Sequence, residues 1–214
     1  NQKDCRRYTG AYISGVQISS SPIWMQQRLK AIGQRPINSI VDITNYILHD
    51  TGQPLHAFDL SAIRGNKVVV KTLPADTAFT TLDGKERKLS ANDLMICDGD
   101  GAMCIGGVFG GLQSGVKEST KAIFLESACF SPDFIRKTSQ FHQLVTDASF
   151  RFARGTDPNN TVTALHRAAK MISEICGGTV SSALTDIYPT PVPNREFYVS
   201  DRRISNLIGK ELGR

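Results

Sequence analysis

The chain of 214 residues is 40% hydrophobic, so it can bury a full core in one large domain or two small ones. No apolar run approaches the roughly 18 residues that a membrane span requires, and we expect no membrane partner. The formal net charge of +5 is mildly basic. This balance is compatible with RNA contact, although no run of Lys and Arg exceeds two residues.

The five cysteines are an odd number, and no two of them form a Cys-x-x-Cys pair. This pattern is not typical of a disulfide framework or a structural zinc site, so we expect reduced thiols and a cytoplasmic location. No basic segment followed by an apolar run opens the chain, which predicts no secretory leader. Because Asn1 stands where a complete chain has Met, we expect a piece of a longer protein.

The first third of the chain predicts a strand and two helices. Residues 9–19 alternate in polarity, as a strand does. Ser21 and Pro22 are typical of an N-cap and a first helical residue, so a helix is expected over about 22–32. A second helix is predicted over 39–50, where apolar side chains recur at helical spacing.

The middle of the chain predicts strands and turns. Asp83-Gly84 is a typical hairpin turn, and the DGDG sequence at 98–101 predicts another. That sequence resembles the start of a calcium loop, but the later ligands are absent, so we interpret it as a turn. Further strands are predicted at 68–70 and 122–126.

The last third predicts two helices, a strand and a linker. A helix is expected over 132–140, and Asp157-Pro158 is interpreted as the cap of a longer one that ends at Gly177. A strand follows near 179–187. The pattern as a whole predicts an α+β fold, with a largely antiparallel central β-sheet surrounded by α-helices.

Three prolines fall within residues 189–194 and are typical of a linker. We therefore divide the chain into a domain over 1–188, a Pro-rich linker over 189–195 and the start of a following module over 196–214. This last segment shows a strand-then-helix pattern that stops at the end of the chain.

The segment from Arg35 to Leu60 carries an unusual density of polar side chains in a frame of Ile, Val, Leu and Phe. These polar residues are Arg35, Asn38, Asp42, Thr44, Asn45, Gln53, His56 and Asp59. Buried polar groups must find partners, so the density indicates a built polar site. No nucleophile elbow, zinc-protease motif, phosphate-binding loop or dinucleotide fingerprint is present, and no residue set predicts a metal site.

Several of the candidate residues also have ordinary structural explanations. Glu126 could be a strand-end charge that faces water, or a buried acceptor for a ligand hydroxyl. Thr146 is a plain N-cap candidate, and a lone His56 is more often structural than catalytic. Arg151 and Arg154 could form salt bridges or contact RNA.

A glycine cluster, GGVFGG, occupies residues 106–111. Its structural explanation is a tight turn, and this is the better one if the cluster is taken alone. The functional explanation is that missing Cβ atoms let a ligand lie against backbone N–H groups. The sequence by itself leaves both open.

Two blocks of sequence resemble the tRNA-editing module of the β subunit of bacterial phenylalanyl-tRNA synthetases. The first is RPINSIVDITNYILHDTGQPLHAFDL, and the second comprises GGVFGG, FLESACF and TDASFRFARGTDP. The resemblance covers roughly residues 5–190. Ala153 departs from it, because the family usually has Glu there.

The resemblance implies a site that hydrolyses tyrosine wrongly esterified to phenylalanine tRNA. By its motifs, Glu126 would accept the tyrosine hydroxyl, assisted by the backbone at Gly107 and Gly110. Thr146 and Ala148 would form the pocket floor. The motifs also imply that Thr44, Asn45 and His56 orient water and ester, and that Arg35 contacts the tRNA 3′ end.

The resemblance further implies a partner α subunit in an α2β2 heterotetramer, in a cytoplasmic ligase that uses ATP and Mg²⁺ elsewhere. No cofactor is expected in this domain itself. Two other functions remain open. One is a non-catalytic module for assembly or tRNA docking, and the other is a free-standing hydrolase of some other aminoacyl ester.

Overall fold

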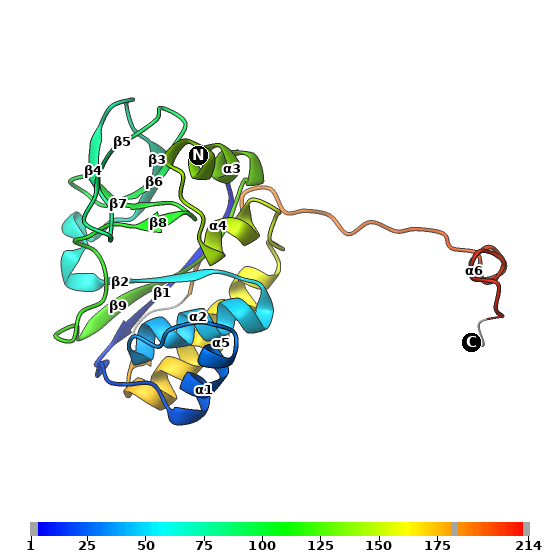
Figure 1. Ribbon diagram of the computed structural model, residues 1–214, viewed down its shortest axis with the longest axis horizontal. Helices are drawn as coiled ribbons and strands as arrows, with labels where there is room; N and C mark the ends of the chain where they lie inside the picture. The colour runs from blue at the N-terminus through cyan, green and yellow to red at the C-terminus, as the bar shows by residue number, and fades with distance from the viewer. Residues whose placement is uncertain (1–3, 181–183, 212–214) are drawn as a thin grey trace.

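The computed structural model describes residues 4–180 and 184–211, and its centre is an antiparallel sheet in the order β10-β1-β9-β2 (Figure 1). The strands are β10 (Thr179–Val180), β1 (Cys5–Ser14), β9 (Ala122–Phe130) and β2 (Leu55–Asp59), while β11 (Thr185–Ile187) also pairs with β1. Helices surround the sheet, so the predicted α+β class is confirmed.

Three helices cover one face of this sheet. They are α1 (Ile23–Ala31), α2 (Ser39–Thr51) and α5 (Asn160–Cys176), which lie together below the sheet in Figure 1. Their apolar sides and the facing strand residues form one buried core, which includes Ile13, Ile43, Ile123, Leu165 and Ile172. Burial of this apolar surface is what holds the three helices against the sheet.

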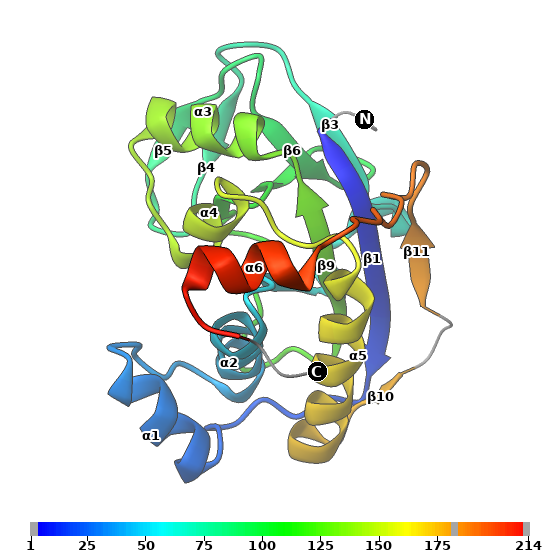
Figure 2. The ribbon, with the colours of Figure 1, turned by 90° about the vertical axis from the view of Figure 1, so that its right-hand side faces the viewer.

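The other side of the central sheet carries a second, smaller set of strands, with its own core. A sheet in the order β3-β6-β7-β8 and a β4-β5 hairpin lie there, next to α3 and α4 (Figure 2). The bounds are β3 (Val69–Thr72), β4 (Ala78–Thr80), β5 (Glu86–Lys88), β6 (Leu94–Cys97), β7 (Ala102–Ile105), β8 (Phe109–Gly110), α3 (Pro132–His142) and α4 (Asp147–Phe152). Both predicted hairpins are confirmed.

The start of the first helix corrects the predicted cap. The N-cap of α1 is Pro22, which offers no side-chain hydrogen bond, and Ser21 does not cap. The Ser21 hydroxyl donates instead to the Asp42 carboxylate, 2.5 Å away. The Ser21 hydroxyl therefore bonds a side chain of another helix instead of the N–H groups at the start of α1.

The longer helix also begins later than Asp157-Pro158 suggests. Its N-cap is Asn159, and Asp157 accepts a hydrogen bond from the Asn159 N–H in the turn before it. The predicted end at Gly177 is confirmed. The strand expected at 9–19 begins earlier and stops at Ser14, because Gly15 adopts φ +71°.

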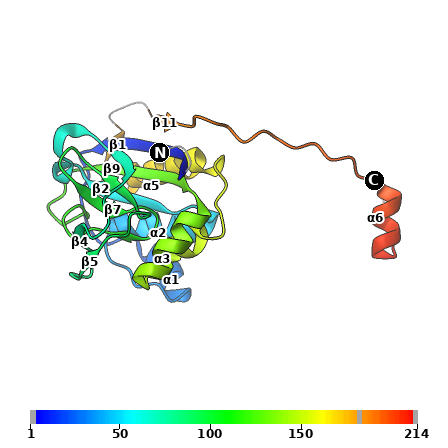
Figure 3. The same cartoon turned by 90° about the horizontal axis from the view of Figure 1, so that it is seen from above.

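The strand expected near 179–187 is two short strands, β10 and β11, with 181–183 outside the described residues. Residues 188–200 form neither helix nor strand, which corrects the strand expected at the start of the last segment. Helix α6 (Asp201–Ile208) follows, separated from the rest of the chain (Figure 3). The division into domain, linker and following module stays a prediction.

Candidate functional site

A small cavity lies between the central sheet, the glycine-containing turn and α4. Its volume is about 80 Å³, and its lining includes His56, Cys104, Gly107, Gly110, Glu126 and Ala148. Five of the predicted site residues therefore meet at one place, although they come from four separate segments of the chain. Apolar side chains, among them Ile96 and Phe152, complete the lining.

Glu126 occupies the middle of β9 and is only 4% exposed, so the interpretation as a strand-end charge facing water is wrong. Its Oε2 accepts a hydrogen bond from the Tyr8 hydroxyl at 2.8 Å. Burial raises the pKa of the Glu126 carboxyl to about 8, against the opposing effect of the Tyr8 bond. The cavity thus contains a carboxyl group that water does not solvate.

His56 lies on β2, directly opposite Glu126 in the β2–β9 register. Its ring packs edge-on against Phe58, with 4.4 Å between centroids. The Nε2 atom is buried and has no hydrogen-bonding partner among the described residues. Burial lowers the pKa of His56 to about 4, so the ring is neutral at pH 7 and can bind a water molecule.

The glycine cluster forms a turn, and Gly107 in this turn is required for two separate reasons. Gly107 adopts φ +68°, and a Cβ there would lie 2.9 Å from side-chain atoms of Phe130, Ile135 and Phe152. Gly110 faces His56, and a Cβ there would lie 3.5 Å from the His56 Cε1. This distance is an ordinary van der Waals contact, so the turn brings backbone close to the imidazole without requiring glycine at 110.

Thr146 is confirmed as the N-cap of α4, in a capping box with Ser149. Its hydroxyl also donates to the Val108 carbonyl at 3.0 Å, which joins α4 to the glycine turn. Thr146 does not itself line the cavity, whereas Ala148, two residues later, does. The Thr146 hydroxyl thus holds α4, and with it Ala148, in place as one wall of the cavity.

Thr44 and Asn45 lie on α2 and are not among the residues that line the cavity. The Thr44 hydroxyl donates to the Val41 carbonyl of its own helix at 2.8 Å. Asn45 precedes His49 by one helical turn, and the His49 Nδ1 lies 3.2 Å from Arg151 of α4. Asn45 is therefore on the side of α2 that faces α4.

Arg35 is exposed and also lies outside the cavity lining. The neighbouring Gln34 donates to the Asp147 carboxylate at 2.7 Å, which places this loop beside the start of α4. Arg151 pairs with the same Asp147, and the Arg154 guanidinium lies 3.5 Å from the Phe150 ring centroid. The salt-bridge interpretation thus holds for Arg151.

Comparison with known proteins identifies the family of this chain. Residues 4–177 match the model of the B3/4 domain. The chain belongs to the B3/4 domain family. It is 52% identical over 98% of its length to a phenylalanine–tRNA ligase β subunit of Bacteroides fragilis, and 53% identical over 97% to that of Porphyromonas gingivalis. The chain spans about a quarter of those relatives, at 26% and 25% of their lengths.

The fold also matches a solved structure. An N-terminal fragment of the phenylalanyl-tRNA synthetase β subunit from Pyrococcus horikoshii superposes with a TM-score of 0.53, at 14% sequence identity. The match covers 99% of this chain and 58% of that fragment. At such low identity, the likeness shows the fold alone.

Sequence reasoning missed two groups of the B3/4 domain site, Tyr8 and Cys104. Tyr8 belongs to β1, more than a hundred residues from Glu126, and only the strand register brings the two together. Cys104 lines the cavity, and its thiol lies 3.3 Å from the Phe109 carbonyl oxygen. The one signal in the sequence was Glu126, a charged residue within an apolar strand, and this signal does not specify which residue it bonds to.

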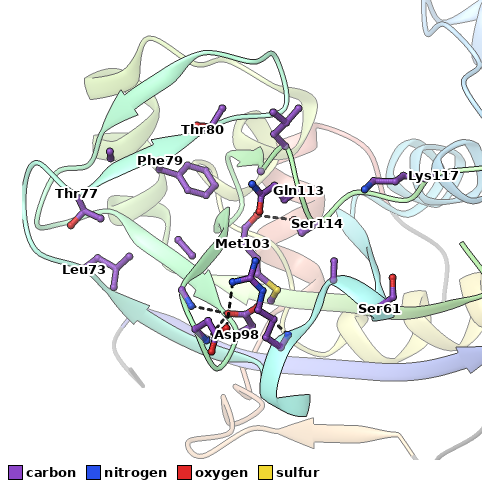
Figure 4. Close-up of a pocket in the computed structure, with 18 residues that line it drawn as sticks. Ser61, Leu73, Thr77, Phe79, Thr80, Asp98, Met103, Gln113, Ser114 and Lys117 are labelled. Carbon is purple, nitrogen blue, oxygen red and sulfur yellow. Dashed lines mark hydrogen bonds and ion pairs between the residues drawn. The ribbon is translucent and has the colours of Figure 1, made fainter. Parts of the chain in front are cut away.

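A larger groove of about 940 Å³ is lined in part by Thr77, Phe79 and Met103 (Figure 4). Ala102 and Met103 of β7 and Gly111, just after β8, line the groove, whereas Cys104 of β7 and Gly110 of β8 line the cavity. Asp98 at its edge accepts hydrogen bonds from the N–H groups of Arg64, Asp100 and Gly101. None of the predicted site residues lines this groove.

The described residues hold no group of three or more His, Cys, Asp or Glu side chains placed to bind a metal ion. Among those same residues, no helix has the length and apolar character to cross a membrane.

Proposed function

We propose that this chain is the editing domain of a phenylalanine–tRNA ligase β subunit and hydrolyses tyrosine esterified to phenylalanine tRNA. The names of the relatives support the subunit assignment. One observation carries the editing activity, namely a buried carboxyl group, Glu126, in a cavity whose other walls are mostly apolar or glycine. A phenol ring with a hydroxyl at its tip has the matching chemistry.

The physical need for such a site is clear. An apolar pocket for phenylalanine rejects an analogue with one extra hydroxyl by only about a hundredfold. A site that hydrogen-bonds the hydroxyl discriminates by roughly 10⁴ or more, because the analogue without it leaves buried polar groups without partners. Glu126 would be such a group when phenylalanine enters.

The cavity size supports a particular placement of the substrate. A volume of about 80 Å³ is well below the roughly 300–1,000 Å³ of sites that enclose whole small molecules. It is also below the roughly 150 Å³ of a cavity that holds a benzene ring. We therefore place only the hydroxyl-bearing tip of the amino-acid side chain inside, and the ester and ribose outside. Arg35, in the exposed loop beside α4, would then meet the tRNA 3′ end.

The hydrolytic step needs a positioned water more than a strong base, because an aminoacyl ester is already reactive. His56, with its pKa of about 4, is too weakly basic to hold a proton at pH 7. Its neutral ring would orient the water through Nε2. In this proposal Thr44 and Asn45 of α2 contact the ester.

The complete ligase would supply the remaining chemistry. We assign ATP, Mg²⁺ and phenylalanine activation to other parts of that enzyme, a cytoplasmic α2β2 assembly with an α subunit. The segment after the Pro-rich linker would begin the next module of the β subunit.

Calorimetry with two non-hydrolysable 3′-aminoacyl-adenosine analogues, tyrosyl and phenylalanyl, tests the proposal. We expect the chain to bind the tyrosyl analogue at least about tenfold more tightly, and Glu126→Ala to abolish that preference. Glu118→Ala, which removes an exposed carboxylate, should keep it. Equal binding of both analogues by the unaltered chain would contradict editing and favour the docking module.

A further inference from the structure

We propose that Tyr8 is a positioning residue for hydroxyl recognition: its phenol holds one oxygen of Glu126 and leaves the other oxygen to accept the ligand hydroxyl. This inference rests on the proposed function and adds a residue to it. The Tyr8 hydroxyl donates to the Glu126 Oε2 at 2.8 Å. No other hydrogen bond to this carboxyl is formed within the described part of the chain.

The register of β1 and β9 makes this contact possible. Gly10 lies directly opposite Glu126, and Tyr8 lies opposite Ala128, so Tyr8 and Glu126 are diagonal neighbours on one face of the sheet. A Cβ at Gly10 would lie 2.2 Å from the Phe124 ring. The absence of a side chain at Gly10 therefore leaves this face open for the Phe124 ring and the Tyr8 phenol.

Because Tyr8 donates to only one oxygen of Glu126, it also fixes the direction of the other oxygen. With Oε2 engaged, the plane of the carboxyl group is set, and the remaining Oε1 is the oxygen available to a group in the cavity that Glu126 lines. Without Tyr8, the two oxygens are equivalent and the buried group can turn toward any donor. Positioning by Tyr8 thus reduces the reorganisation that ligand binding requires.

A purely structural role for Tyr8, in which it only satisfies a buried carboxyl, predicts an equal loss of affinity for both analogues when the hydroxyl is removed. A positioning role also predicts a change in pH dependence. The Tyr8 bond favours the ionised form of Glu126 and lowers its pKa, in opposition to burial. Removal of the hydroxyl should therefore raise that pKa. If the ionised carboxylate accepts the ligand hydroxyl, the pH at which tyrosyl preference develops should move upward as well.

The experiment measures tyrosyl and phenylalanyl analogue affinities between pH 6.5 and 9.5 for the chain, Tyr8→Phe and Tyr12→Phe. Tyr12 is a matched control, because it lies on the same face of β1, four residues from Tyr8, and does not line the cavity. We expect Tyr8→Phe to lose about tenfold of the tyrosyl preference while its affinity for the phenylalanyl analogue is kept. The midpoint of the pH dependence of that preference should move above about pH 8. Tyr12→Phe should match the unaltered chain.

Two outcomes would overturn the role of Tyr8. One is an unchanged tyrosyl preference in Tyr8→Phe, and the other is an equal loss of affinity for both analogues, which marks a structural role. Equal binding of the analogues by the unaltered chain would instead contradict the proposed function. A carbon NMR titration of the Glu126 carboxyl tests the bond without any ligand, since Tyr8→Phe should raise its midpoint and Tyr12→Phe should not.

Discussion

His56 and Glu126 face each other across the β2–β9 pair, and burial shifts their pKa values to about 4 and about 8 respectively. An ion pair between them would shift both values the other way. No hydrogen bond joins the two side chains in the described structure. Between about pH 4 and pH 8 the cavity therefore presents two polar groups that are predominantly uncharged.

Stability should depend on pH through Glu126. Between its ordinary pKa of 4.5 and about 8, the folded chain holds a proton that the unfolded chain has released, so the free energy of unfolding falls as pH rises. His56 acts in the opposite direction between about 4 and 6.5, which leaves pH 6.5–8 to Glu126. Urea denaturation should show a loss of about 2 kcal/mol across that window, with Glu126→Gln nearly flat. An identical slope in Glu126→Gln would show that other groups cause it.

His56 should be more important for the hydrolysis of tyrosyl-tRNA than for the binding of the tyrosyl analogue. His56→Ala removes the group proposed to hold the water, so we expect tyrosyl-tRNA hydrolysis to fall by about a hundredfold or more. Affinity for the non-hydrolysable tyrosyl analogue should stay within about threefold, since Glu126 reads the hydroxyl. His166→Ala is the control, because His166 is exposed on α5. An unchanged hydrolysis rate in His56→Ala would remove His56 from the mechanism.

A larger side chain at Ala148 should close the cavity. Ala148 lines it from α4, and Met keeps a high helix propensity, so Ala148→Met should obstruct the ligand while the helix persists. We expect affinity for both aminoacyl analogues to fall by at least about tenfold in calorimetry. Ala31→Met, at the exposed end of α1, should bind normally. Normal binding by Ala148→Met would place the ligand elsewhere.

Gly107 should resist substitution for steric and conformational reasons together. Its φ is +68°, and a Cβ added there would lie 2.9 Å from atoms of three side chains, so Gly107→Ala should lower the free energy of unfolding by about 1–3 kcal/mol. Gly101→Ala is the control, because a Cβ there meets nothing within 4 Å. Thermal unfolding measures both variants. Equal midpoints would mean that the turn adapts without cost.

Local sequence was enough for much of the secondary structure. Thr146 caps α4 and Gly177 ends α5 because these residues satisfy or relax the backbone within a few positions of themselves. The Asp83-Gly84 turn pairs its own neighbours into a hairpin, so its partners are also near in sequence. Where a distant partner competed, as Asp42 does for Ser21, the local pattern predicted the wrong cap.

The sequence by itself determined the fold class, the main helices and, through its resemblance, the candidate site residues. Only the tertiary structure decided that Glu126 is buried beside Tyr8, that His56 lies opposite it, and that Thr44 and Arg35 lie outside the cavity. The physical reason is that pKa values and hydrogen-bond partners depend on strand register and burial. These are set by contacts between segments far apart in the chain, which local spacing does not encode.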